Sequence, residues 1–355
     1  MCAKIAVAMS GGVDSSVAAW LLKEAGHTLT GVTMDLFHGE CGMPPAADLS
    51  DAPLVAAQLG IPHHMLDLSQ CFRDSVVEPF VRCYESGQTP NPCCHCNRTL
   101  KFGRLLEEAG ALGCEKLSTG HYVRLECSPE GRYLLKKALH PEKDQSYCLY
   151  SLSQEQLSRS VFPLGDLSKD EIRAIAAEHG LASAHRSDSQ DICFIPDGDY
   201  AAFIARYRGC EFAPGDFLDE AGNVLGRHEG VIHYTVGQRR GLGVSSNHGR
   251  LYVKDVCPAD NTVTLSENSS LFSTTLTADR VNFIPFDRLD GPTRMYAKVR
   301  YRMKEQPCTV EQTGPDSIRV TFDRPQRAIT PGQAVVLYDG DYLVGGGTIL
   351  KGEAQ

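Results

Sequence analysis

Lys4 to Lys23 reads KIAVAMSGGVDSSVAAWLLK, and this order of residue types predicts a strand, a glycine turn and a helix. Ile5 to Met9 is a short apolar run, typical of a strand buried on both faces. From Val17 the apolar residues recur at helical spacing, so Ser10 to Ser16 should form the turn that opens the helix. Its paired glycines, its hydroxyls and the free amides of the first helical turn together predict an anion site, with phosphate as the favoured anion.

The glycine turn does not match the two commonest nucleotide motifs. It lacks the lysine and the spacing of G-x-x-x-x-G-K-[ST], and it is not G-x-G-x-x-G. Ser10 to Ser16 instead resembles the pyrophosphatase loop of ATP-dependent enzymes that adenylate an oxygen and release pyrophosphate. The alternative is an ordinary glycine turn between a strand and a helix.

Length and composition indicate a water-soluble protein of two or three domains. The chain has 355 residues, of which 42% are apolar, and no apolar run approaches the ~20 residues of a membrane span. With no apolar signal region before the first strand, we expect a cytoplasmic protein without membrane contact. The 14 cysteines should then be mostly reduced. The formal charge of −9 argues against a general nucleic-acid coat, although a local basic surface remains compatible with it.

The pattern changes along the chain. Strands alternate with helices as far as Tyr122, which predicts a doubly wound parallel α/β sheet. After Tyr207, short alternating runs separated by turn residues predict small β domains, including strands at 231–236 and 297–301, with a break near 269–277. Lys298 to Lys304 places a cation at every second position around an aromatic residue, so one strand face could contact an RNA backbone.

Cysteines are concentrated in one short segment. Gly87 to Asn97 contains prolines and an asparagine, so Cys93, Cys94 and Cys96 are expected on a stiff loop. A helix over 97–108 would place Cys96 near a helix N-terminus, where the amide dipoles lower a thiol pKa. The alternative is half a zinc site, but neither a second C-x-x-C nor a spaced histidine pair accompanies it.

An adenylated oxygen must be displaced by a nucleophile, and thiolates are the strongest candidates in the chain. Cys96 on the loop and Cys193 on a distant extended segment fit a relay in which one thiol carries a persulfide and the other resolves it.

Motifs spread over nearly the whole chain resemble the bacterial tRNA-specific 2-thiouridylase family. They are Ser10–Ser16, Thr89–Pro92 with Cys96–Asn97, Gly120–His121, Lys143–Gln145, Ser189–Cys193, Gly237–Gly243 and Arg300–Tyr301. The resemblance implies an ATP pyrophosphatase domain (1–203), a central β-rich domain (204–274) and a C-terminal β-barrel that contacts tRNA (275–355). It also implies thiolation of the wobble uridine of tRNAs for lysine, glutamate and glutamine. Sulfur would come as persulfide from a cysteine desulfurase or a relay protein, and we expect a monomer.

The resemblance also implies site residues. Cys193 would hold the persulfide, and Cys96 would release the sulfur by closing a disulfide with it. ATP, with Mg²⁺ on its phosphates, would be bound by Ala8, Met9, Ser10, Gly11, Gly12, Val13, Asp14, Ser15, Met34 and Gly120. The tRNA would be contacted by Asn91, Pro92 and Cys93 at the target base, and by His121, Lys143, Asp144, Gln145, Arg300, Tyr301 and Gln333.

One position departs from the family pattern. Cys93 stands where an aspartate commonly follows Thr-Pro-Asn-Pro, so the role of that carboxylate cannot be transferred. Cys93, Cys96 and Cys193 could instead hold an iron-sulfur cluster that assists sulfur transfer, and this alternative stays open beside the persulfide relay. The rival enzyme is a small-molecule adenylating ligase, and the rival of another class is a redox sensor that binds nucleotide and metal.

Overall fold

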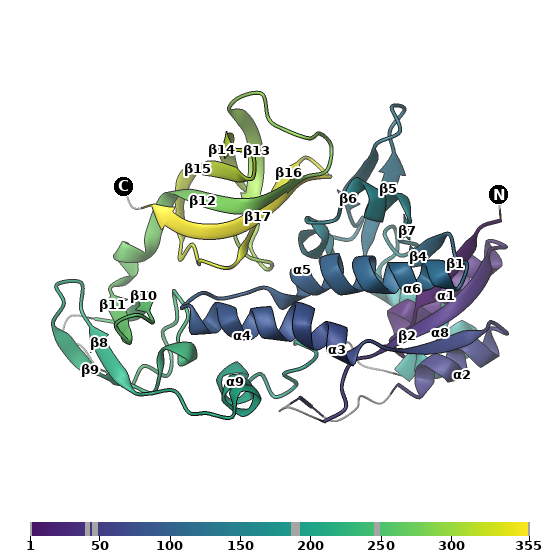
Figure 1. Ribbon diagram of the computed structural model, residues 1–355. Coiled ribbons are helices and arrows are strands. Elements are labelled where there is room, and N and C mark those ends of the chain that lie inside the picture. Colours follow the sequence, from purple (N-terminus) through teal and green to yellow (C-terminus); the bar gives the residue numbers. More distant parts are fainter. Residues whose placement is uncertain (1, 40–42, 45–48, 186–191, 245–248, 354–355) are drawn as a thin grey trace. The chain divides into compact units, whose positions relative to one another are not determined.

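The computed structural model describes residues 2–39, 43–44, 49–185, 192–244 and 249–353 (Figure 1). Contacts within the chain divide it into two compact units. The first unit comprises Met1–Val76, Cys93–Gly198 and Gly340–Val344, and the second comprises Val77–Pro92, Asp199–Asp339 and Gly345–Gln355. Among the described residues, no helix combines the length and the apolar character needed to cross a membrane.

The first unit is built on a five-stranded parallel sheet in the order β3-β2-β1-β4-β7. The central strand β1 lies between β2 and β4, and its residues Ile5, Ala6 and Val7 are almost completely buried, as a run without alternation predicts. The strands are β1 (Lys4–Ala8), β2 (Thr28–Asp35), β3 (His63–Asp67), β4 (Lys116–Ser118) and β7 (Ser160–Val161).

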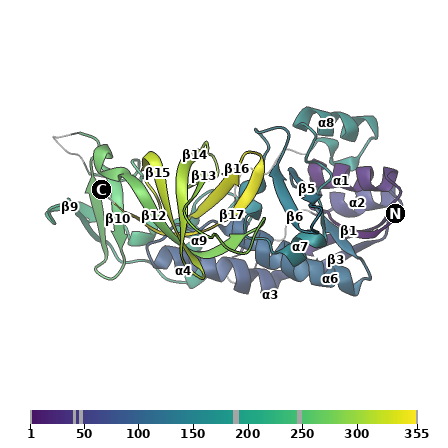
Figure 2. The same ribbon diagram turned by 90° about the horizontal axis from the view of Figure 1, so that it is seen from above.

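Helices cover both faces of this sheet. Figure 2 shows α1, α2 and α8 on one side of it and α6 on the other, and the apolar sides of α1, α2 and α8 share one core with the strands. The predicted doubly wound α/β fold is therefore confirmed. The helical segments are α1 (Val13–Glu24), α2 (Asp51–Gln58), α3 (Ser69–Phe72), η1 (Arg73–Val77), α5 (Pro92–Cys96), η2 (Asn97–Arg104), α6 (Leu105–Ala111), η3 (Ser146–Leu149), α7 (Gln154–Ser158), α8 (Lys169–Glu178) and η4 (Ala182–His185).

A hairpin that the sequence analysis missed completes the first unit. It consists of β5 (Val123–Cys127) and β6 (Tyr133–Lys137), and residue Lys136 of β6 pairs with Tyr342, at the start of β17 (Tyr342–Glu353). Asp341 strengthens this junction, because its carbonyl accepts a hydrogen bond from the amide of Lys137 at 2.9 Å and its carboxylate accepts one from Arg124 at 3.0 Å.

The second unit contains a small β-rich part after α4 (Glu78–Glu85) and α9 (Tyr200–Arg208). Its four strands follow the order β10-β11-β8-β9 and enclose an apolar core around Phe217 and Val263. They are β8 (Gly215–Leu218), β9 (Val224–His228), β10 (Tyr252–Cys257) and β11 (Thr262–Ser266). The predicted strand at 231–236 is wrong, because residues Val231–His233 form the 3-10 helix η5.

The rest of the second unit is an antiparallel barrel of six strands, which confirms the β-barrel that the family resemblance implied. The ladder runs β12-β15-β14-β13-β16-β17, and pairing of β12 with β17 closes it. After the 3-10 helix η6 (Asn268–Leu271), the strands are β12 (Phe272–Phe283), β13 (Thr293–Lys298), β14 (Gln306–Gly314), β15 (Ser317–Arg327), β16 (Ala334–Asp339) and β17.

The barrel corrects one expectation. β13 ends at Lys298, and residues 299–303 form bends and turns, so the predicted strand at 297–301 is too long. The cations of Lys298 to Lys304 therefore do not share one strand face. Lys298 itself lies 3.7 Å from the carboxylate of Glu305 and over the ring of Tyr338.

Candidate functional site

The glycine turn lies at the carboxyl end of the central strand β1. Gly11 has φ of +76°, a conformation that glycine adopts without strain. The helix α1 begins at Val13, earlier than the predicted turn Ser10–Ser16 allowed, so Asp14 and Ser15 belong to its first turn. The Ser15 hydroxyl donates to the carbonyl of Gly12 at 3.0 Å and accepts the amide of Ser10 at 3.2 Å. These bonds fix a turn whose first helical amides are free to face an anion.

Asp14 is held by two side chains from other segments. The Lys169 ammonium donates to its carboxylate at 2.7 Å, and the Tyr122 hydroxyl donates to the same oxygen at 2.6 Å. Both partners are buried. Lys169 opens α8, whose start is fixed by a capping box between Ser168 and Glu171. The sequence does not reveal the role of Lys169, since the capping motif predicts where α8 begins but not that Lys169 contacts Asp14.

Gly120 packs directly against the first turn of α1. A Cβ atom on Gly120 would lie 2.9 Å from the amide nitrogen of Ser15 and 3.0 Å from the carbonyl carbon of Asp14. Met34 is half-buried near the carboxyl end of β2, the neighbour of β1, whereas Met9 is buried with its sulfur against Gly31. The structure thus brings the turn, Gly120 and Met34 to one edge of the sheet, where ligands of such folds bind.

The segment that carries the clustered cysteines is helical. Pro92 to Cys96 forms α5, and the π-helical η2 follows directly, so the predicted stiff loop is wrong for these residues. Pro92 takes the first position of the helix, where its missing N–H costs nothing and its fixed φ is favourable. Within α5, Cys94 is buried, Cys96 is half-buried and Cys93 is exposed.

The thiols of Cys93, Cys96 and Cys193 share one electrostatic environment. Although Cys93 and Cys193 are exposed residues, protein atoms around their sulfurs desolvate the thiolates and raise the pKa of Cys93 to about 11 and that of Cys193 to about 12. The thiolates of Cys96 and Cys93 add to the rise at Cys193, and the Lys101 ammonium opposes it. Burial also raises the pKa of Cys96, so the predicted lowering by a helix N-terminus is wrong.

The described thiols are reduced, and their grouping can be tested against a metal site. All described cysteines, including Cys96 and Cys193, are free. Over the described ranges, no group of three His, Cys, Asp or Glu residues is placed to hold a metal ion. The residues present therefore do not fit an iron-sulfur cluster in this arrangement. Ser189 to Asp191, part of the motif that precedes Cys193, lie outside the described residues.

A second thiol pair, Cys94 and Cys148, joins α5 to η3. A hydrogen bond from the Cys94 thiol, together with the charge of Lys101, lowers the pKa of Cys148. The Cys94 sulfur also lies 3.8 Å from the carbonyl of Tyr147, and the Asn97 amide donates to the carbonyl of Cys148 at 3.0 Å. No sequence motif marks Cys148, because its partner is distant in the chain.

The expected tRNA residues of the first unit differ in accessibility. His121 is buried and its ring bonds to the Thr119 hydroxyl at 2.7 Å, and burial holds its pKa well below the usual range. The Asp144 carboxylate accepts the Ser146 hydroxyl at 2.8 Å, and the side-chain carbonyl of Gln145 accepts the amide of Tyr122 at 3.0 Å. Lys143 is half-buried in the same turn.

The expected tRNA residues of the second unit lie on the barrel and at the start of α5. Arg300 and Tyr301 are exposed after β13, and the Arg300 guanidinium donates to the carbonyls of Arg327 and Ala328. Asn91 is half-buried directly before Pro92. The Gln333 amide nitrogen donates to the carbonyls of Thr89, at 2.9 Å, and Pro90, at 3.1 Å.

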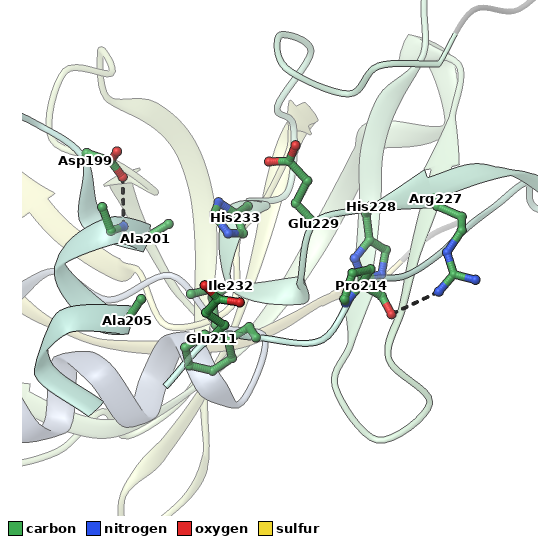
Figure 3. Close-up of a pocket in the computed structure, with 12 residues that line it drawn as sticks. Asp199, Ala201, Ala205, Glu211, Pro214, Arg227, His228, Glu229, Ile232 and His233 are labelled. Carbon is green, nitrogen blue, oxygen red and sulfur yellow. Dashed lines mark hydrogen bonds between the residues drawn. The ribbon is translucent and has the colours of Figure 1, made fainter. Parts of the chain in front are cut away.

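A pocket of about 750 Å³ in the second unit contains none of the predicted site residues. Figure 3 shows Ala201 and Ala205 of α9 on one wall, with Ile232 and His233 beyond them. Three of its polar side chains serve the fold. His228 bonds to the carbonyl of Asn261 at 3.1 Å, Arg227 bonds to that of Pro214 at 3.3 Å, and Asp199 caps α9 at 2.9 Å. This pocket therefore carries no assigned chemistry.

Comparisons with known proteins match three family models in succession. Residues 3–197 match the "tRNA methyl transferase HUP domain", 201–267 the "tRNA methyl transferase PRC-barrel domain" and 273–349 the "Aminomethyltransferase beta-barrel domain".

Full-length relatives are also similar. The chain is 49% identical over 357 residues to tRNA-specific 2-thiouridylase MnmA 1 of Caldanaerobacter subterraneus subsp. tengcongensis, with 98% of each chain covered. It is 45% identical over 355 residues to tRNA-specific 2-thiouridylase MnmA of Clostridioides difficile, again with 98% of each chain covered. With this identity over nearly the whole length, the chain belongs to the tRNA-specific 2-thiouridylase family.

Proposed function

We propose that the protein is an ATP-dependent tRNA 2-thiouridylase that replaces the C2 oxygen of the wobble uridine by sulfur. The observation that carries this proposal is that one unit holds both the glycine turn and the three thiols. The turn Ser10–Ser15 with Gly120 lies at the sheet edge, and the thiols of Cys93, Cys96 and Cys193 act on one another electrostatically. Two relatives that share 98% of their length with this chain carry the name of this activity.

The turn suits the first step. ATP would place its phosphates on the amides of the α1 N-terminus, where the helix dipole favours negative charge, and Mg²⁺ would enter on those phosphates. The uridine O2 attacks the α-phosphate and pyrophosphate leaves, so the oxygen becomes part of a good leaving group. Lys169, fixed on Asp14, provides a cation beside this turn in place of a Walker lysine.

The thiols suit the second step. A donor persulfide, from a cysteine desulfurase or a relay protein, loads the terminal sulfur on Cys193. That sulfur attacks C2 of the adenylated uridine and AMP leaves with the oxygen. Cys96 attacks the Cys193 sulfur and closes a disulfide, so the two thiols supply the two electrons that reduce the transferred sulfur. A dithiol reductant must then reopen the disulfide before the next cycle.

The raised thiol pKa values determine whether these cysteines are protonated in the resting enzyme. With pKa values of about 11 and 12, Cys93 and Cys193 are protonated at neutral pH, which protects the resting enzyme from alkylation and oxidation. Lys101 acts on Cys93, Cys96, Cys148 and Cys193, and so stabilises whichever sulfur is charged during transfer.

The test is mass spectrometry of wobble-uridine thiolation in tRNAs for lysine, glutamate and glutamine, with ATP, Mg²⁺ and a persulfide donor under anaerobic conditions. Cys193→Ser and Cys96→Ser should abolish thiolation and retain ATP binding, whereas Cys114→Ser, at a buried cysteine elsewhere in the first unit, should thiolate normally. Thiolation by Cys193→Ser at the wild-type rate would refute the proposal and favour a nucleotide-binding sensor. Pyrophosphate release without tRNA would favour a small-molecule ligase.

Cys93 decides between the relay and the cluster-assisted alternative. Because the described residues form no metal group, we propose the two-thiol relay, in which Cys93→Ala still thiolates. Loss of thiolation in Cys93→Ala, together with stoichiometric iron and acid-labile sulfide in the wild type, would establish the cluster instead.

A further inference from the structure

The peptide that precedes α5 is held by the barrel through three hydrogen bonds. The amide of Thr89 donates to the carbonyl of Pro331 at 2.9 Å. In return, the Gln333 side-chain amide donates to the carbonyls of Thr89 at 2.9 Å and Pro90 at 3.1 Å. The main chain of residues 89–90 is therefore bound from one side by residues 331–333.

Two glycines allow the backbones to meet at this place. Gly332 has φ of +87°, and a Cβ there would lie 2.9 Å from the carbonyl oxygen of Thr89. Gly87 has φ of +74°, and a Cβ there would lie 2.8 Å from the carbonyl oxygen of Val256, at the end of β10. The Thr89 hydroxyl also donates to that of Thr235 at 3.2 Å. Residues 87–90 therefore contact both the barrel and the β-rich part of the second unit.

Gln333 is itself rigidly held. Its carbonyl accepts the amide of Ile349 in β17 at 2.8 Å, and the amide of Gly332 donates to the carbonyl of Ile349 at 2.9 Å. A glutamine side-chain nitrogen has two protons, and both are used on Thr89 and Pro90. Gln333 therefore has no side-chain donor left with which to read a base or a phosphate.

We propose that Gln333 is a positioning residue that fixes the start of the cysteine helix and sets its place when tRNA binds the barrel. This inference rests on the proposed function. We call residues 331–333 the clamp. Only Asn91 separates the bound residues 89–90 from Pro92, the first residue of α5, and the two prolines stiffen this link. A shift of the clamp therefore passes to the helix that carries Cys93 and Cys96. The resemblance to the family predicts instead that Gln333 touches the tRNA, and the two roles differ in measurable ways.

The experiment uses Gln333→Met, which keeps the length of the side chain and removes both donors. Gln306→Met is the matched control, because Gln306 lies on the same barrel and its side-chain amide donates to the carbonyl of Lys304, its neighbour in the chain. We expect Gln333→Met to lower kcat for thiolation about 10-fold or more with the tRNA Kd within about 2-fold of wild type. Hydrogen exchange at Thr89 and alkylation of Cys93 should accelerate, whereas Gln306→Met should change none of these values.

An unchanged kcat with a weakened tRNA Kd would overturn the proposal and assign Gln333 to direct tRNA contact. Unchanged exchange at Thr89 and unchanged alkylation in Gln333→Met would also overturn it, because the clamp would then not hold the helix. The exchange and alkylation measurements need no turnover, so they decide the role of Gln333 even if the wild-type protein proves not to thiolate tRNA.

Discussion

Gly120→Ala should weaken ATP binding through a contact that the structure locates. The added Cβ would lie 2.9 Å from the Ser15 amide nitrogen and 3.0 Å from the Asp14 carbonyl carbon, where ordinary contacts begin at 3.4 Å. Both neighbours are backbone atoms of the first turn of α1 and cannot rotate away. The turn must therefore move by about 0.5 Å, and overpacking of this kind costs about 1–3 kcal/mol. The turn can relax in the free protein, but bound phosphates require its undistorted geometry. The cost therefore falls on the nucleotide-bound form, and the ATP Kd rises about 5- to 150-fold.

The assay is calorimetric titration of Mg-ATP, with the tRNA Kd and the thermal midpoint measured on the same preparations. Gly291→Ala is the matched control, because a Cβ at Gly291 meets no atom within 4 Å and its backbone requires no positive φ. The expected result is weaker ATP binding by Gly120→Ala with an unchanged tRNA Kd. An ATP Kd within 2-fold of wild type, in a folded variant, would refute the placement of the nucleotide at this turn.

Three further outcomes are expected. Lys169→Met removes the cation on Asp14, so tRNA-dependent pyrophosphate release should fall about 10-fold or more, and a wild-type rate would exclude Lys169 from the ATP site. Lys101→Met removes the charge that lowers the pKa of the Cys93 thiol. Because protonated thiols do not react, the pH at which Cys93 is alkylated should rise in this variant, whereas the control Arg98→Met should leave it unchanged. Arg208→Met removes the guanidinium that bonds both Glu85 and Glu78, of which Glu78 keeps its bond to Arg82, and should lower the free energy of unfolding by about 1–3 kcal/mol in urea titration. Exposed Arg82→Met should lower it by less than about 1 kcal/mol.

The features best predicted from the sequence are those that depend on residues close together in the chain. The apolar run before Ser10 and the glycines after it predicted the central strand, the turn and the helix, and the parallel sheet is confirmed. Element ends were predicted less well. The prolines of 87–97 predict a stiff loop, but Pro92 starts a helix, because proline favours the first helical position as much as it breaks an interior.

Residues that act through distant partners could not be predicted. Lys169 and Asp14 are far apart in the chain and meet only because α8 packs against α1. The same holds for Cys94 and Cys148, and for Gln333 and Thr89. The raised pKa of Cys96 has a similar origin, since burial by the tertiary fold outweighs the dipole of any helix turn near it.

The strand β17 has a consequence for the order in which the chain is made. Residues 340–344 belong to the first unit and complete the hairpin edge at Lys136 and Lys137, although Gly340 follows Lys137 by 203 residues in the chain. During translation this hairpin therefore has an open edge, a template for wrong pairing, until the ribosome has added those residues. A fragment that stops at residue 197 would keep that edge unpaired, so the first unit is completed only by a segment that follows the whole β-rich part and most of the barrel.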